Sequence, residues 1–173
     1  EPHTFFADGI AVHNKGGGCF PAGTLVRTPA GDRAIEALLP GDSVLGIDHR
    51  GCVVRASVEA AHVARDAIFI VETDLGALRT TREHPLRRAD GSFRPAGDLA
   101  PGDRIVHLDG DRLGLATVLA TRDSGETDVV YNLTVDAPHT FIADGFVVHN
   151  KGGGGFHGGG GSGGDAGWIP FFV

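Results

Sequence analysis

The chain has 173 residues, a mass of 17.9 kDa and a net charge of −7, from 15 Lys and Arg against 22 Asp and Glu. Hydrophobic residues make up 41% and charged residues 21%, which is typical of one globular domain and excludes a fully disordered chain. The acidic balance disfavours a nucleic-acid partner, and two cysteines are too few for a disulfide-framed small protein.

The first twenty residues return near the end of the chain. Residues 1–20 read EPHTFFADGIAVHNKGGGCF and residues 137–156 read APHTFIADGFVVHNKGGGGF, with 15 of 20 positions identical at an offset of 136. The copies are either two structural hairpins or the ends of two successive modules. We favour the second interpretation, in which residues 1–18 are the tail of an upstream repeat. His13-Asn14 then lacks its own domain, and we expect it to be inert.

The first residue is Glu and the chain has no Met, so we expect a piece of a longer or processed protein. No signal peptide is visible, and no apolar run approaches the roughly 20 residues of a membrane helix.

Most of the remaining chain has the residue types of short strands separated by Gly, Pro, Asp and Ser. Residues 33–39 alone suggest a short helical turn. Strands are expected at residues 24–28, 43–47, 53–63, 68–73, 77–81, 104–108, 113–121, 129–135 and 146–148. Glu59, Ala60, Ala61 and Ala64 weaken the prediction locally. Many short strands in one unit predict an all-β fold.

A second, weaker repeat lies inside this strand-rich region. Residues 38–48 read LLPGDSVLGID and residues 99–109 read LAPGDRIVHLD, an offset of 61. In both copies Pro-Gly-Asp predicts a turn, and the apolar residues after it predict a strand. The region therefore has two related halves with pseudo-two-fold symmetry, unless two separate turns merely share the same chemistry.

The C-terminal segment changes in character. Residues 151–167 are rich in glycine and hold too little apolar surface to fold, so we expect a flexible linker. Residues 168–173 (WIPFFV) are apolar, but six residues do not decide whether a membrane segment follows in a parent chain.

Cys19 opens the region after three glycines, and its thiol can attack the carbonyl of Gly18 through a five-membered ring. The product is a thioester in place of the peptide bond. This exchange is uphill in an unstrained chain, so the fold has to strain the bond or stabilise the oxyanion. Taken alone, a single Cys is more often a small buried hydrophobic residue.

Thr81-Arg82-Glu83-His84-Pro85 lies at the end of an expected strand. The His84 imidazole can protonate an amide nitrogen that leaves as an amine, and the Thr81 hydroxyl can hold the carbonyl or orient the His84 ring. The alternative is a histidine that caps a turn.

His149-Asn150 closes the region. The Asn150 carboxamide can attack its own carbonyl, form a succinimide and break the bond to Lys151. His149 can supply the proton, and His139 can raise the nucleophilicity of the amide. The alternative is a polar strand end.

These three features span 132 residues (150 − 19 + 1), and their joint order is more specific than any one of them. The sequence resembles the Hint superfamily of inteins, Hedgehog autoprocessing domains and bacterial intein-like domains. The resemblance is carried by residues 19–26 (CFPAGTLV), 41–45 (GDSVL), 81–86 (TREHPL), 130–135 (VYNLTV), 139–141 (HTF) and 145–150 (GFVVHN).

The resemblance implies a horseshoe-shaped all-β fold of two pseudo-two-fold related halves, with both termini at one catalytic centre. It implies that Cys19 is the acyl-shift nucleophile, assisted by Thr81 and His84. It also implies that His139 and His149 assist the cyclisation of Asn150. No cofactor is implied.

The sequence departs from ordinary inteins in one respect that changes the outcome. Inteins are followed by Cys, Ser or Thr, whereas Lys151 has neither a thiol nor a hydroxyl. This resembles the bacterial intein-like type. Either another nucleophile such as water takes the Gly18 acyl group, or Asn150 cyclises first and the Lys151 amine joins Gly18. We expect cleavage to dominate. Asn132 stands where many family members have Asp.

We therefore predict a monomeric self-processing domain at residues 19–150 that acts on its own flanks, residues 1–18 and 151–173. The nine histidines lack zinc-type spacing, so no metal is expected. Cys52 is expected to pack in a strand; a disulfide to Cys19 would silence the nucleophile. The alternatives are an inactive spacer of Hint fold, or N-terminal cleavage alone with acyl transfer to an outside nucleophile.

Overall fold

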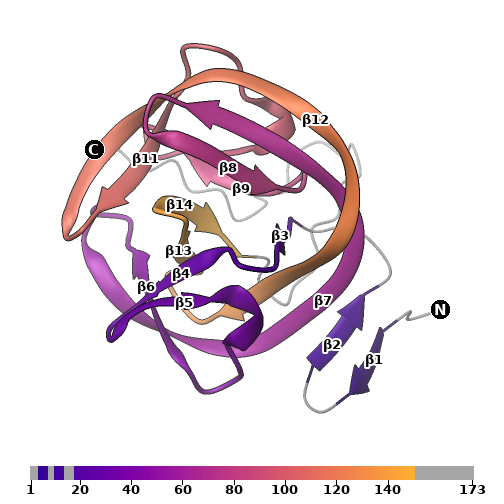
Figure 1. The fold of residues 1–173 in the computed structure, drawn as a ribbon. Coiled ribbons are helices and arrows are strands. Elements are labelled where there is room, and N and C mark those ends of the chain that lie inside the picture. Colours follow the sequence, from indigo (N-terminus) through magenta and orange to yellow (C-terminus); the bar gives the residue numbers. More distant parts are fainter. Residues whose placement is uncertain (1–3, 8–9, 14–17, 151–173) are drawn as a thin grey trace, which may run out of the picture.

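The computed structural model describes residues 4–7, 10–13 and 18–150. These residues form strands and two single-turn 3-10 helices, with no α-helix in the described part of the chain (Figure 1). The strands are β1 (Thr4–Ala7), β2 (Ile10–His13), β3 (Phe20–Pro21), β4 (Leu25–Thr28), β5 (Gly31–Ala34), β6 (Ser43–Ile47), β7 (Val53–Thr73), β8 (Gly76–Thr80), β9 (Pro85–Arg87), β10 (Phe93–Pro95), β11 (Arg104–Asp109), β12 (Arg112–Val135), β13 (Thr140–Ala143) and β14 (Phe146–His149). The fold is all-β, as the sequence predicts.

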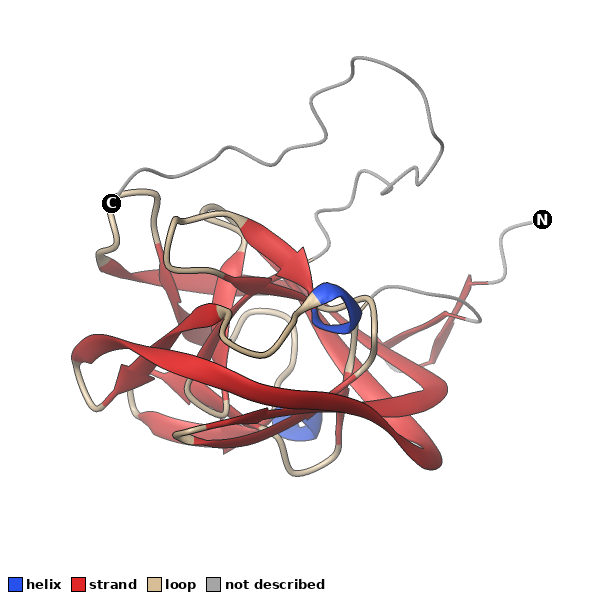
Figure 2. Ribbon diagram, turned by 90° about the horizontal axis from the view of Figure 1, so that it is seen from above, coloured by secondary structure: helices blue, strands red, loops and turns tan. Residues whose placement is uncertain are grey.

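The helical turns are η1 (Ile35–Ala37) and η2 (Ala96–Asp98), and Figure 2 shows them as short coils among the strands. η1 falls within the helical turn expected at residues 33–39, whereas η2 was not expected. No helix in the described ranges is long and apolar enough to cross a membrane. Asn14, Lys151, the glycine-rich residues 152–167 and the apolar end lie outside the described residues.

Two long strands, β7 and β12, form the frame of the fold. They pair antiparallel from Val58↔Val135 at one end to Thr73↔Val118 at the other. Three register irregularities interrupt the pairing, and such irregularities bend and twist a strand pair. Figure 1 shows both strands curving around the shorter ones. The whole is one open sheet of 14 strands, in which most neighbours are antiparallel.

The hydrogen bonds at the two Pro-Gly-Asp turns match one another. Gly41 N–H donates to Val58 O at 2.8 Å in the first turn, and Gly102 N–H donates to Val118 O at 2.8 Å in the second. In each pair the valine N–H donates back, at 2.8 Å, to the carbonyl of the aspartate after the glycine. A 3-10 turn precedes each Pro-Gly-Asp turn. The pseudo-two-fold relation predicted from the offset of 61 is therefore confirmed.

The largest core cluster holds the residues beside the predicted chemical groups. Phe20 follows Cys19, Leu86 lies two residues after His84, and Val148 lies two residues before Asn150. All three side chains are fully buried in this cluster. Burying one such side chain stabilises a fold by about 1.5–3 kcal/mol. Core packing therefore fixes the three segments that carry the chemistry.

Tertiary pairing extends the strands beyond what local pattern predicts. The strands expected at 53–63 and 68–73 are one strand, β7, and those expected at 113–121 and 129–135 are joined in β12. The poor strand formers between Glu59 and Ala64 lie inside β7, because pairing with β12 outweighs local propensity. Five strands of two to four residues, β3, β5, β9, β10 and β13, are too short to show an alternation and were not predicted, whereas β4 and β14 were.

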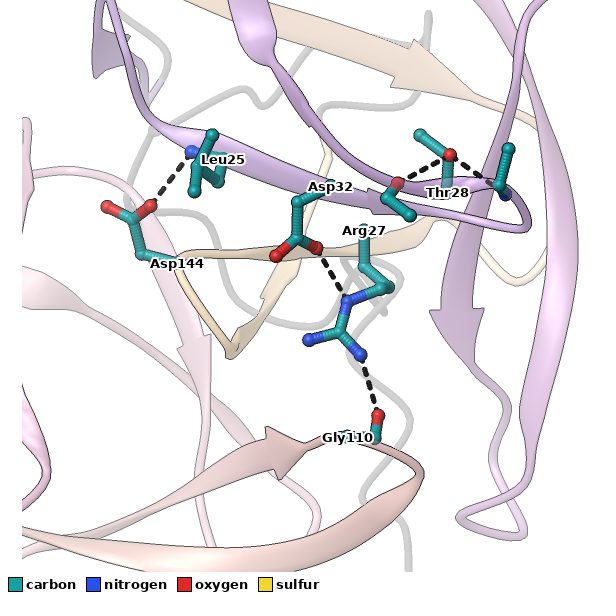
Figure 3. A network of polar contacts seen from close by, with 8 residues as sticks. Leu25, Arg27, Thr28, Asp32, Gly110 and Asp144 are labelled. Atoms are coloured by element: carbon teal, nitrogen blue, oxygen red, sulfur yellow. Dashed lines mark hydrogen bonds and ion pairs between the residues drawn. The ribbon is translucent and has the colours of Figure 1, made fainter.

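The terminal hairpin β13–β14 is fastened to β4 at its turn. The Asp144 carboxylate accepts the Leu25 N–H at 2.8 Å (Figure 3). The Asp144 N–H in turn donates to Leu25 O at 2.7 Å. Nearby, Arg27 donates to the Gly110 carbonyl at 2.6 Å and so joins β4 to the turn between β11 and β12. The hairpin that leads to Asn150 is thereby held from its far end.

Candidate active site

Cys19 is clamped through its backbone to the end of β8. Its N–H donates to Thr81 Oγ1 at 2.9 Å, and its carbonyl accepts the Thr81 N–H at 3.0 Å and the Thr80 hydroxyl at 3.1 Å. The Cys19 side chain is 7% exposed and packs with Ile68 and Val130. The sequence placed Thr81 in this group but missed Thr80, which no spacing distinguishes from its neighbour.

The spacing of Thr81 and His84 has a local cause. The His84 N–H donates to the Thr81 carbonyl at 3.3 Å, which closes a turn between β8 and β9. A turn of this kind brings its first and fourth residues together. The two side chains that the sequence paired therefore lie on one turn, next to Cys19.

The His84 ring is enclosed by aromatic side chains. It is 0% exposed, its centroid is 4.2 Å from that of Phe20, and it is 6.2 Å from that of Phe141. Burial lowers the pKa of His84 to about 3, the Gly18 backbone opposes this shift, and the charge of His149 adds to it. Neither ring nitrogen has a hydrogen bond of good geometry among the described residues. His84 is therefore neutral near pH 7.

Gly18 is packed against this ring so closely that no side chain fits. A Cβ built on Gly18 would meet the Cα, Cβ and Nδ1 atoms of His84, well inside van der Waals contact. The Cα and Cβ atoms of His84 are fixed by its backbone, so they cannot rotate away as the end of a flexible side chain would. The residue before Cys19 is therefore restricted to glycine while His84 keeps this position.

Asn150 is 1% exposed and is held at two points. Its backbone N–H donates to His139 O at 2.8 Å, and its Nδ2 donates to Val135 O at 2.9 Å. Its Oδ1 has no hydrogen-bond partner among the described residues. The carboxamide nitrogen that would attack is thus oriented by a backbone carbonyl, which carries no sequence signature.

His139 shares this carbonyl. Its Nδ1 lies 3.0 Å from Val135 O, a hydrogen bond that requires the tautomer with the proton on Nδ1. Its φ of 64° is in the left-handed region, which a histidine adopts more readily than most residues. His139 is exposed to solvent.

His149 lies between the two ends of the domain. Its ring contacts Phe93, with centroids 5.0 Å apart, and lies 6.4 Å from the His139 ring. Burial lowers the pKa of His149, the Asn150 backbone opposes the shift, and His139 adds to it. Because His149 also acts on the pKa of His84, the two imidazoles share one electrostatic environment.

The strand pairing explains why the ends meet. β9, which follows His84, pairs with β14 at Leu86↔Val148, and β3, which follows Cys19, pairs with β12 at Phe20↔Tyr131. The candidate residues of both ends therefore gather around β3, β9 and β14. They are Cys19, Thr81, His84, His139, His149 and Asn150.

One expectation about a neighbouring residue is wrong. Cys52 is exposed in the turn before β7 rather than packed in a strand, and it forms no disulfide with Cys19. Asn132 is buried, and its Oδ1 accepts the Leu133 N–H at 2.8 Å. Among the residues that the structure describes, no group of three His, Cys, Asp or Glu side chains is placed to hold a metal ion.

Comparison with known proteins identifies the family. The profile of the pretoxin HINT domain matches residues 25–153, which is 129 of the 173 residues. The chain belongs to the pretoxin HINT family. The HINT domain also resembles solved structures. For the DnaB intein from Synechocystis, the TM-score is 0.71 at 20% identity over 78% of this chain and 99% of that chain. For the bacterial intein-like domain from Clostridium thermocellum, the TM-score is 0.68 at 29% identity over 76% of this chain and 98% of that chain.

A curated relative supports the same grouping. The Sonic hedgehog protein of Xenopus laevis is 29% identical over 147 residues, which cover 78% of this chain and 33% of that protein. The HINT domain thus spans about a third of this relative's length. Membership of the Hint superfamily, and with it the general class of self-processing domains, is confirmed.

Proposed function

We propose that residues 19–150 form a self-processing domain that cuts at Gly18–Cys19 and at Asn150–Lys151. The observation that carries the proposal is the position of His84. The His84 ring packs against Phe20 and the Gly18 backbone, next to the first proposed cut. Besides burial, the charge of His149, next to the second proposed cut, lowers the pKa of His84. A histidine ring next to each proposed scissile bond, His84 at Gly18 and His149 at Asn150, supports acid–base assistance to both internal nucleophiles.

The first step is an N-to-S acyl shift. The Cys19 thiol loses its proton to a base, and its sulfur attacks the Gly18 carbonyl carbon. The tetrahedral intermediate collapses when the Cys19 nitrogen receives a proton and leaves as an amine. His84 packs against Gly18 and Phe20, which supports it as the group that transfers this proton. The Thr81 hydroxyl accepts the Cys19 amide N–H, and the Thr80 hydroxyl donates to the Cys19 carbonyl.

The second step is cyclisation of Asn150. Nδ2 attacks the Asn150 carbonyl carbon, the bond to Lys151 breaks, and a succinimide remains. Nδ2 loses a proton in this step and the Lys151 nitrogen gains one. The hydrogen bond that Nδ2 donates to Val135 O polarises one of its N–H bonds and so makes the nitrogen a better nucleophile. His149 is the proposed donor of the proton that the Lys151 nitrogen gains.

The products follow from the absence of a thiol or hydroxyl side chain at position 151. Water that reaches the thioester releases residues 1–18, and cyclisation releases residues 151–173. Ligation of Gly18 to Lys151 needs the freed amine to attack the thioester before water does. A released amine is no longer tethered and loses its effective concentration, so cleavage exceeds ligation.

Intact mass of freshly purified protein over several hours, with and without dithiothreitol, tests the proposal. We expect thiol-dependent loss of residues 1–18 and thiol-independent loss of residues 151–173. Cys19→Ala stops only the first loss, and Asn150→Ala stops only the second. An unchanged mass in all samples would instead support the inactive spacer. Loss of residues 1–18 alone would support acyl transfer to an outside nucleophile.

A further inference from the structure

One edge of the long strand β7 is covered along part of its length by neither β6 nor β8. On the side away from β12, β6 pairs with Val53–Ser57 and β8 pairs with Phe69–Thr73. Between these two stretches, the only pairing among the described strands is that of β2 with Ala61–Val63, and it is parallel. A strand edge that its own hairpin neighbours do not cover can accept an added strand through main-chain hydrogen bonds.

The hairpin that occupies this edge is a copy of the hairpin that ends the domain. In β1–β2, Thr4 pairs with His13 and Ala7 pairs with Ile10. In β13–β14, the corresponding pairs are Thr140↔His149 and Ala143↔Phe146. The registers are identical at the offset of 136, so the flank forms the same hairpin unit in a second environment.

The hairpin β1–β2 and the start of the domain are aligned across the sheet, because Val12 and Phe20 fall in the same row of paired residues. Val12 pairs with Val63 of β7, Val63 pairs with Tyr131 of β12, and Tyr131 pairs with Phe20 of β3. Three strand spacings separate Val12 from Phe20, which is about 14 Å. The eight residue steps between them can span up to about 27 Å. The short connection therefore lets the hairpin stay on β7 while Gly18 stays against His84.

We propose that the β7 edge at Ala61–Val63 is a docking site for the flank hairpin of residues 4–13, and that docking holds the N-terminal scissile bond in the site. The second half of this inference rests on the proposed function. Docking restrains the chain on the far side of Gly18 and so raises the fraction of molecules in which Gly18 is seated against His84. The observed rate of the acyl shift scales with this fraction.

The β7 edge is also suited to docking by residue size. The paired stretch is Ala61, His62 and Val63, with Ala60 directly before it and Ala64 directly after it, so three of these five residues are alanine. A parallel ladder of three residues is weak by itself, because each hydrogen bond contributes only about 1 kcal/mol net. The covalent link to Cys19 keeps the hairpin at high local concentration, which compensates for this weakness.

Hydrogen exchange tests the docking without any need for activity. The protein carries Cys19→Ala and Asn150→Ala so that both flanks remain attached. In one sample residues 4–13 are native, and in the other they are replaced by a Gly-Ser sequence of equal length. We expect the replacement to speed exchange in residues 59–65 about fivefold or more and to leave residues 53–57 and 69–73 unchanged. Equal exchange at residues 59–65 in both samples would overturn the docking site.

Processing kinetics test the consequence. In the native background, Ala11→Pro removes a backbone donor from β2, whereas Ala11→Val keeps it and installs the residue found at the matching position 147. We expect thiol-induced loss of residues 1–18 to slow about threefold to tenfold in Ala11→Pro and to persist in Ala11→Val. Loss of residues 151–173 keeps its rate in both variants. Equal rates of N-terminal loss would refute the role of docking. If the native protein shows no thiol-dependent loss, the proposed function fails, while the exchange result still decides the docking site.

Discussion

The Thr81 hydroxyl accepts the backbone N–H of Cys19 at 2.9 Å, so the amide nitrogen that has to leave is bound by the first residue of the turn that carries His84. In the proposed acyl shift, this contact links the backbone of the nucleophile, Cys19, to the turn of the proton-transferring residue, His84. It is buried, and hydrogen bonds that are lost in a buried site are not replaced by water.

Replacing Thr81 tests this contact. Thr81→Ala leaves the Cys19 N–H without its acceptor and is expected to slow thiol-induced loss of residues 1–18 by about tenfold to a hundredfold. Thr81→Ser keeps the hydroxyl and should retain most of the rate. The measurement is the time course of intact mass with dithiothreitol. Equal rates in the alanine and serine variants would show that the hydroxyl has no role.

Thr80 is expected to hold the same residue, Cys19, through its next peptide group. Its hydroxyl donates to the Cys19 carbonyl at 3.1 Å and is fully buried. Thr80→Val keeps the shape but removes the donor. We expect a loss of unfolding free energy of about 1 kcal/mol and a several-fold slower N-terminal step. Urea unfolding measures the first effect and mass spectrometry the second. A variant with native stability and native rate would contradict this role.

Gly18 is expected to tolerate no side chain. A Cβ at this position would meet the backbone and ring of His84, so Gly18→Ala has to displace one or the other. We expect N-terminal cleavage to fall by at least about tenfold, because a small displacement of reacting groups costs this much. Cleavage at Asn150 should continue at its native rate in the same sample. Normal N-terminal cleavage in the alanine variant would show that His84 is not held where the contact places it.

The buried histidine makes stability depend on pH in a defined direction. The pKa of His84 is about 3 in the fold, whereas an unfolded histidine titrates near 6.5. Between these values the unfolded chain binds the extra proton, so the free energy of unfolding falls as pH falls from about 7 towards 3. In the Cys19→Ala, Asn150→Ala background we expect about 2 kcal/mol less stability at pH 5 than at pH 7 from this group.

His84→Gln is the matched control for this pH effect. Glutamine does not titrate, so the variant should lose the part of the pH dependence that His84 supplies. A smaller dependence of the same sign remains, because burial also lowers the pKa of His149. Urea unfolding at the two pH values measures both proteins. Identical pH dependence in both would contradict a neutral buried His84.

His139 can be removed without backbone strain. Its φ of 64° suits glycine, so His139→Gly should fold at least as well as the native chain. The variant loses the imidazole next to Val135 O, the oxygen that also binds the Asn150 side chain. We expect the release of residues 151–173 to slow by about tenfold, with N-terminal cleavage unchanged. Release at the native rate would exclude His139 from the cyclisation step.

The sequence predicts those parts of the site that depend on local spacing or on family resemblance. Thr81 and His84 are three residues apart, and a single turn joins them, so the pair was visible in the chain itself. Cys19 and Asn150 were identified only through the order of several motifs across the resemblance. The sequence shows the two halves because the Pro-Gly-Asp segments repeat at an offset of 61. In the structure both turns make the same hydrogen bonds.

Other parts of the site depend on contacts that leave no pattern in the sequence. The Val135 carbonyl orients both Asn150 and His139, but a backbone oxygen is the same in every residue. Nothing in the sequence distinguishes Thr80 from other strand threonines, because its contact with the Cys19 carbonyl appears only in the folded structure. The continuity of β7 through Ala60, Ala61 and Ala64 likewise depends on β12, which supplies a partner along nearly its whole length.

The central claim is that Cys19 exchanges its peptide bond for a thioester. The most direct measurement is capture of that thioester with a small thiol near pH 7, followed by mass spectrometry of the released flank. The account predicts a fragment of residues 1–18 that carries the thiol on the Gly18 carbonyl, formed by the native chain and absent from Cys19→Ala. A native chain that remains uncut, or a fragment that forms equally in Cys19→Ala, would contradict it.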